Sequence, residues 1–143
     1  MSKAVLTMQG CQYYPQMEPE KIELVTEGEL YWRENGWEIT YEESDLTGLE
    51  GVHTTIRVEP GQVTLRRTGK LRSEMVFQEG VAHESLYQMD FGALLVTVCA
   101  RQISASIGAR GGTVDLVYSI ELEGNGTGLV EYHMDIQTQE PAE

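Results

Sequence analysis

The stretch that decides the fold is YEESDLTGLEGVHTTIRVEPGQVTLRRTG, residues Tyr41 to Gly69. On both sides of the Pro60-Gly61 turn, apolar and polar residues alternate, and a period of two is typical of a strand with one buried face. The stretch therefore predicts a β-hairpin. Arg67 shares the parity of Val63 and Leu65, so a permanently charged side chain is predicted on the face that is otherwise apolar.

The same alternation recurs along the whole chain, with turn signals at short intervals between the runs. It is clearest in the last two runs, on either side of residues 123–126, which predict a final hairpin. In these runs one face carries Val114, Leu116, Tyr118, Ile120 and Leu122, then Val130, Tyr132, Met134 and Ile136. The other predicted strands lie near residues 4–14, 22–31, 36–43, 52–58, 63–68, 71–77, 85–91 and 94–107.

This pattern predicts the fold class. Many antiparallel strands joined by tight turns close most economically into a barrel, because closure leaves no exposed strand edge. We therefore expect a single all-β domain over residues 1–143, an antiparallel β-barrel with a polar tail over about residues 137–143. A sandwich of two sheets is the alternative.

Composition bounds the partners. The chain has 10 Lys and Arg against 23 Asp and Glu, a net charge of −13, so it repels phosphate groups. We expect no nucleic acid and no membrane among its partners. The chain begins with a short polar segment instead of a signal peptide, and Cys11 and Cys99 form no metal or redox motif, which favours a cytoplasmic protein with two reduced thiols.

The chain contains histidines and a glycine-rich turn, but not at the spacing that a metal site or a phosphate site requires. His53, His83 and His133 have no second metal ligand at a regular distance along the chain. Gly108 to Gly112 precedes a strand and not a helix, so it lacks the amide-lined helix terminus of a phosphate site. We therefore expect no catalytic residue, no metal and no cofactor, and an enzyme is the least favoured class.

The charged residues at inward parity are the candidates for a site. Glu43 shares the parity of Ile39 and Tyr41, just as Arg67 shares that of its apolar neighbours, so both charges are aimed at the interior. An unpaired buried charge costs several kcal/mol, so we expect the two to be neighbours. One interpretation is an internal ion pair that fixes strand register, or an Arg at a strand end that reaches solvent. The other is a polar anchor in a ligand cavity.

Two tyrosines would accompany such an anchor. Tyr118 lies at inward parity in the last pair of strands, and Tyr87 shares the parity of Met89 and Phe91, which we expect to face the same interior. An antiparallel barrel is concave only at its open ends. We therefore expect any ligand site at one mouth, lined by Glu43, Arg67, Tyr87 and Tyr118.

The chain resembles the YwiB-like family of small bacterial proteins, a family with a domain of unknown function. The resemblance runs nearly end to end and is carried by Tyr41-Glu42-Glu43, the Gly48 to Gly51 loop before Thr54-Thr55, Arg67-x-Gly69, Met75-x-Phe77, the Tyr87 to Gly92 stretch and Tyr118. It implies a calycin-like, lipocalin-type β-barrel and a bacterial cytosolic setting. It implies no reaction.

Two functions remain open at this point. The first is non-catalytic binding of a small, partly apolar molecule inside the barrel. The alternative is a structural or protein-interaction module with a filled barrel, which works through its acidic outer face or as a homodimer.

Overall fold

The computed structural model of the chain describes residues 2–15, 17–44, 49–123 and 125–139. Within these ranges the chain is built from ten strands, and no helix in them is long and apolar enough to cross a membrane. The strands are β1 (Ser2–Tyr13), β2 (Glu20–Arg33), β3 (Gly36–Glu42), β4 (Val52–Glu59), β5 (Gln62–Gly69), β6 (Leu71–Phe77), β7 (Ala82–Met89), β8 (Gly92–Gly108), β9 (Gly111–Leu122) and β10 (Asn125–Thr138).

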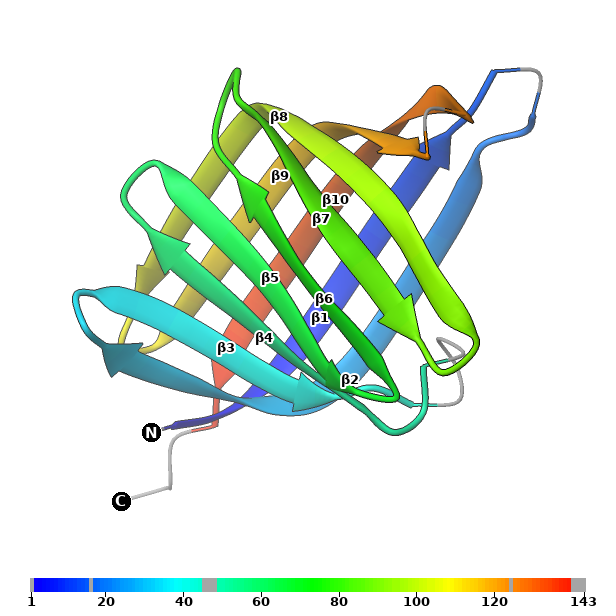
Figure 1. The fold of residues 1–143 in the computed structure, drawn as a ribbon. Helices are drawn as coiled ribbons and strands as arrows, with labels where there is room; N and C mark the ends of the chain where they lie inside the picture. The colour runs from blue at the N-terminus through cyan, green and yellow to red at the C-terminus, as the bar shows by residue number, and fades with distance from the viewer. Residues whose placement is uncertain (1, 16, 45–48, 124, 140–143) are drawn as a thin grey trace.

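The ten strands form one closed antiparallel barrel (Figure 1). Each strand pairs with the next one along the chain, and β1 closes the barrel by pairing with β10 from Ala4 opposite Thr138 to Tyr13 opposite Leu129. The predicted antiparallel barrel is confirmed, and the two-sheet sandwich is not the arrangement of these strands. Each strand therefore has a neighbour on both sides, although β6 and β7 pair only at Leu71–Met89 and Arg72–Gln88.

The barrel has two different ends. We call the end with the β1–β2, β3–β4, β5–β6, β7–β8 and β9–β10 connections the mouth end, which lies on the right in Figure 1. The opposite end, which we call the terminal end, carries the other connections, the start of β1 and the end of β10. There the Gln139 amide donates to the Lys3 carbonyl oxygen at 2.8 Å. Strand β10 runs through Thr138, two residues into the predicted polar tail, and residues 140–143 lie outside the described ranges.

The strand boundaries follow the prediction closely except at β7. Met89 pairs with Gly92, so the β7–β8 hairpin closes over a two-residue turn formed by Asp90 and Phe91. Phe91 is 86% exposed in this turn, and the prediction that it faces the interior is wrong. Period two holds only within a strand, and here the strand ends at Met89.

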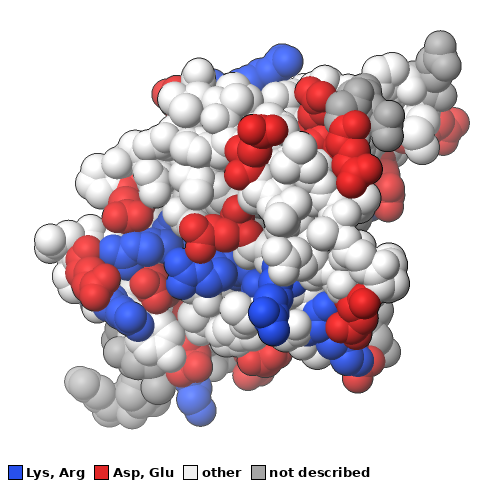
Figure 2. Space-filling model, viewed as in Figure 1, with Lys and Arg blue, Asp and Glu red and all other residues white. Residues whose placement is uncertain are grey.

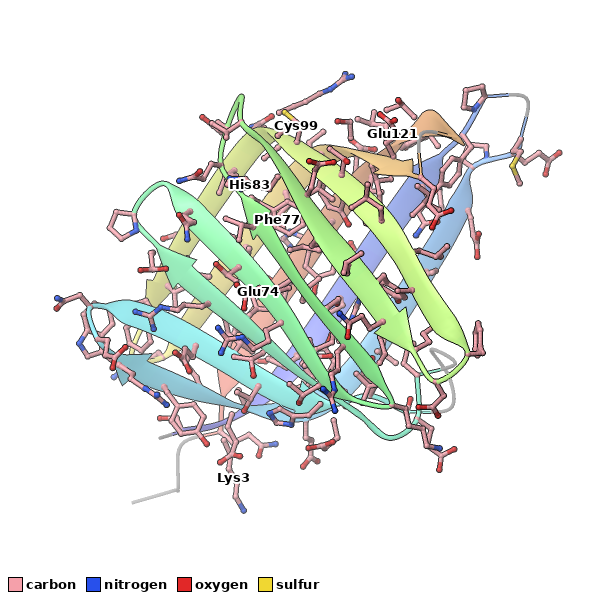
Figure 3. The ribbon with its side chains drawn as sticks, viewed as in Figure 1. Lys3, Glu74, Phe77, His83, Cys99 and Glu121 are labelled. Carbon is pink, nitrogen blue, oxygen red and sulfur yellow. The ribbon has the colours of Figure 1, made fainter. Side chains whose placement is uncertain are left out.

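The core forms a layer across the interior, and a hollow of about 720 Å³, lined by Trp37, Val58 and Ile103 among others, lies on its terminal-end side. The fully buried side chains of the core come from strands all around the barrel and include Leu6, Ile39, Phe77 and Met134. Phe77, labelled in Figure 3, projects inward from β6, and its ring lies 4.6 Å from that of Tyr118, centre to centre. This layer separates the two ends of the interior and forms the floor of the mouth-end half.

One glycine in β2 is required by close packing. A Cβ on Gly28 would collide with the carbonyl oxygen of Thr40 on β3 and lie 2.8 Å from the Leu6 side chain on β1. Both neighbours are fixed, because the carbonyl is backbone and Leu6 is fully buried. Gly108 at the end of β8 has no such neighbours within 4 Å.

We expect Gly28→Ala to lower the free energy of unfolding by about 1–3 kcal/mol, the usual cost of forcing an extra methyl group into a packed site. Gly108→Ala is the matched control and should stay within about 0.5 kcal/mol of the wild type, as exposed positions generally do. Urea unfolding followed by fluorescence measures both. Equal stabilities for the two variants would contradict this packing.

Candidate ligand-binding cavity

The half of the interior nearest the mouth end is open. It encloses a cavity of about 690 Å³, within the range of ~300–1,000 Å³ typical of small-molecule sites. Its floor is made by core residues such as Val63, Met75 and Phe77. The lining residues Ile22, Leu94 and Leu122 are partly exposed near the mouth end, so the cavity reaches solvent there.

All four residues predicted for the site line this cavity. Arg67 projects from β5, Tyr87 from β7 and Tyr118 from β9, while Glu43 directly follows β3. The Glu43 amide donates to the Val52 carbonyl oxygen at 2.9 Å, which continues the β3–β4 ladder by one residue and keeps the Glu43 side chain at inward parity. The rest of the lining is mostly apolar.

The predicted neighbourhood of Glu43 and Arg67 is confirmed. Arg67 Nε lies 3.9 Å from Glu43 Oε2, and the side chains are 18% and 2% exposed. This distance allows strong Coulomb attraction but is too long for a hydrogen bond. The carboxylate instead accepts a hydrogen bond of 2.6 Å from the hydroxyl of the buried Thr54. The pair therefore balances the charge in the cavity without using the Arg67 Nε proton.

Several buried polar atoms lack a hydrogen-bond partner among the described protein atoms. Arg67 Nε and Tyr132 Oη belong to residues that line the cavity, while Ser73 Oγ and Ser85 Oγ belong to residues of β6 and β7 that do not. Arg67 pairs with Ser73 across the β5–β6 ladder, so two of these atoms belong to one layer of the barrel. A buried donor without a partner lowers stability by about 1–3 kcal/mol. A group that accepted hydrogen bonds from this layer would therefore be bound favourably.

The tyrosines give the cavity neutral hydroxyl groups. Burial raises the pKa of Tyr118 to about 12, although the nearby Arg67 guanidinium opposes the shift. Burial also raises the pKa of Tyr132 well above its usual value, and burial followed by the Glu43 charge raises the pKa of Tyr41. At neutral pH these phenols are therefore protonated and can donate hydrogen bonds into the cavity.

Three polar residues of this layer were not named as site residues by the sequence analysis. Tyr41 and Tyr132 line the cavity, and Thr54 holds the Glu43 carboxylate. Each lies at inward parity in a strand whose other inward residues are apolar, which is the same signal that identified Arg67. Applying that criterion to hydroxyl groups as well as to charges would have found them.

The remaining candidates lie away from the cavity. His53 contacts Glu42 at 2.6 Å, and His133 lies between Asp115 and Asp135 at 2.6 and 3.0 Å, on the outer face. The Gly108 to Gly112 segment forms the β8–β9 turn at the terminal end.

The basic residues of β4 and β5 do not form a continuous positive surface. Figure 2 shows blue side chains interleaved with red ones on this face. Arg57 bonds Glu38 at 2.8 Å, and Arg66 bonds Glu74 at 3.0 Å. Pairing of this kind neutralises the basic residues locally and leaves no patch typical of a phosphate-binding surface.

We expect Thr54→Val to lower the free energy of unfolding by about 1.5–3 kcal/mol, because it removes a hydrogen bond to a buried carboxylate without changing side-chain volume. Thr55→Val, one residue away on the outer face, is the control and should change stability by less than about 0.5 kcal/mol. Chemical unfolding provides the comparison. If the two variants were equally stable, Thr54 would not be supporting Glu43.

Comparison with known proteins identifies the family. Residues 7–140 match the family described as a domain of unknown function, DUF1934. Over 104 residues, which are 72% of this chain and 71% of the other, the chain is 28% identical to the protein named "Uncharacterized beta-barrel protein YwiB" of Bacillus subtilis. The crystal structure of the ywiB protein from Bacillus subtilis has the same fold, with a TM-score of 0.87 and 22% identity over 97% of this chain and 93% of that one. The resemblance inferred from the sequence is confirmed, and the chain belongs to the DUF1934 family.

Proposed function

We propose that this barrel is a non-catalytic binding protein that holds a small, partly apolar molecule in its cavity. The observation that carries the proposal is the combination of an open volume of about 690 Å³ with buried polar atoms that have no protein partner. Small-molecule sites have this composition, a mainly apolar wall with a few placed polar groups. Glu43, Arg67, Tyr87 and Tyr118 are the proposed ligand-contacting residues, to which we add Tyr132.

The lining supports binding more than it supports catalysis. The buried charges of Glu43 and Arg67 balance each other, Glu20 adds an exposed carboxylate to the lining, and burial keeps Tyr118 and Tyr132 protonated at neutral pH by raising the pKa of each. A general base needs a pKa near the working pH, and a nucleophile needs such a base beside it. The apolar wall, in contrast, offers favourable burial of a ligand's hydrocarbon surface.

A homodimer or protein-interaction module is the second candidate, and one observation favours it. Leu86, Phe91 and Leu95 on the β7–β8 hairpin are 49%, 86% and 40% exposed, which is typical of an apolar contact surface. The filled barrel that this candidate assumed does not fit the open cavity. Binding of nucleic acid is not proposed, because the net charge is −13 and the basic residues of β4 and β5 are paired with carboxylates.

The proposal is tested by filling the cavity. Gly10 on β1 lines the cavity between its ladder partners, Tyr132 on β10 and Ile22 on β2. A Cβ added to Gly10 would have the Glu131 carbonyl oxygen, 4.0 Å away, as its nearest neighbour. We expect Gly10→Leu to abolish binding of an uncharged apolar fluorescent dye, because the leucine side chain occupies the ligand volume. Stability should stay equal or rise, since the substitution fills empty space and removes a glycine from a strand.

Gln9→Leu is the matched control, because the neighbouring residue is exposed on the outer face. It adds the same side chain outside the cavity and should leave the dye affinity unchanged. The proposal would be overturned by a wild type that fails to bind the dye, or by a Gly10→Leu protein that binds it as the wild type does.

A further inference from the structure

The chemistry of the unpartnered polar atoms narrows the class of ligand. Of the lining residues, Arg67 contributes Nε, which is only a donor, and Tyr132 contributes a hydroxyl that can donate as well. A ligand that satisfies Arg67 Nε must therefore present a hydrogen-bond acceptor. Because these atoms are buried, the acceptor has to lie inside the cavity and not at its rim.

The charge balance of the cavity selects against an anionic acceptor. The Arg67 charge is already matched by Glu43, 3.9 Å away, so a bound carboxylate or phosphate would add a negative charge with no counterion. The pKa of Tyr118 indicates how strongly the interior disfavours a negative charge. Its pKa is raised to about 12 because burial outweighs the attraction of Arg67. The cavity therefore disfavours a further anion even beside its arginine.

The exposed part of the lining defines the other end of the ligand. Ile22, Leu94 and Leu122 are the large apolar side chains of the cavity that reach solvent, with exposures of 46%, 36% and 38%. A hydrocarbon tail that covered these side chains would remove their surface from water. On β5, Arg67 lies two residues from the mouth end, and the apolar lining residues Val63 and Leu65 lie below it, so the polar group and this part of the tail would share the mouth-end side of the cavity.

From these observations we infer that the ligand is an uncharged amphipathic molecule with a carbonyl-type acceptor, an ester, amide or ketone on an alkyl tail. The acceptor oxygen takes hydrogen bonds from Arg67 Nε and the Tyr132 hydroxyl, and the tail covers the apolar lining. This inference rests on the proposed binding function and adds to it the chemical class of the ligand.

The test compares three ligands with nearly the same tail. Methyl octanoate, octanoate and octane are each titrated at neutral pH to displace the uncharged dye from the wild-type protein. We expect the ester to bind about tenfold more tightly than octane, the effect of one good hydrogen bond, and more tightly than octanoate. Octanoate binding as tightly as the ester would overturn the uncharged class. Octane equal to the ester would show that the polar atoms do not contact the ligand and would overturn the inference too.

Substitutions of Arg67 and Tyr132 test whether these two residues contact the ester. Arg67→Met keeps most of the side-chain volume, and Arg66→Met is its control on the outer face, where Arg66 pairs with Glu74. Arg67→Met should reduce the affinity for the ester about tenfold and leave that for octane unchanged. Because this variant also strands Glu43, Tyr132→Phe provides a second test that removes only a hydroxyl group. It should likewise weaken the ester alone.

These outcomes separate the two levels of the proposal. Equal ester affinity in the wild type, Arg67→Met and Tyr132→Phe would overturn the inferred contact while dye binding still supported the binding function. Absence of binding by the dye and by all three ligands would overturn the binding function itself, and the inference with it.

Discussion

Closure of the sheet between β1 and β10 is the constraint on which the rest of this structure depends. In a closed barrel every strand has one face toward a single shared interior, so any polar residue at inward parity is committed to that interior. Glu43 and Arg67 are committed in this way from opposite sides of β4, and each would be costly to bury alone. Because the two residues are neighbours, each charge is compensated by the other inside the barrel.

The interior is divided by a packed layer. Buried apolar side chains such as Leu6, Phe77 and Met134 form this layer and supply the hydrophobic stabilisation. The half nearest the mouth end is left open, with hydroxyl and guanidinium groups above the floor. Arg67 Nε and the Tyr132 hydroxyl give up hydrogen bonds there, which lowers stability. A binding site makes such a cost useful, because a ligand can supply the missing partners.

Much of this arrangement could be predicted from the sequence, because period two is a local signal. It located the strands, the barrel and the Glu43–Arg67 pair, and it brought Tyr87 and Tyr118 to the same cavity. It could not decide whether the interior is open, since this depends on which side chains meet across the barrel. Phe91 was misplaced because the hairpin register, set by the Met89–Gly92 pair, ended the strand two residues earlier.

The central claim is that the barrel is open and that its buried donors are reserved for a ligand. A high-resolution crystal structure of the protein purified from its own host tests this most directly. The account predicts electron density for a non-protein molecule in the cavity, with an acceptor atom about 2.7–3.2 Å from Arg67 Nε. Side chains that fill the cavity, or a protein group that accepts the Arg67 Nε hydrogen bond, would contradict it.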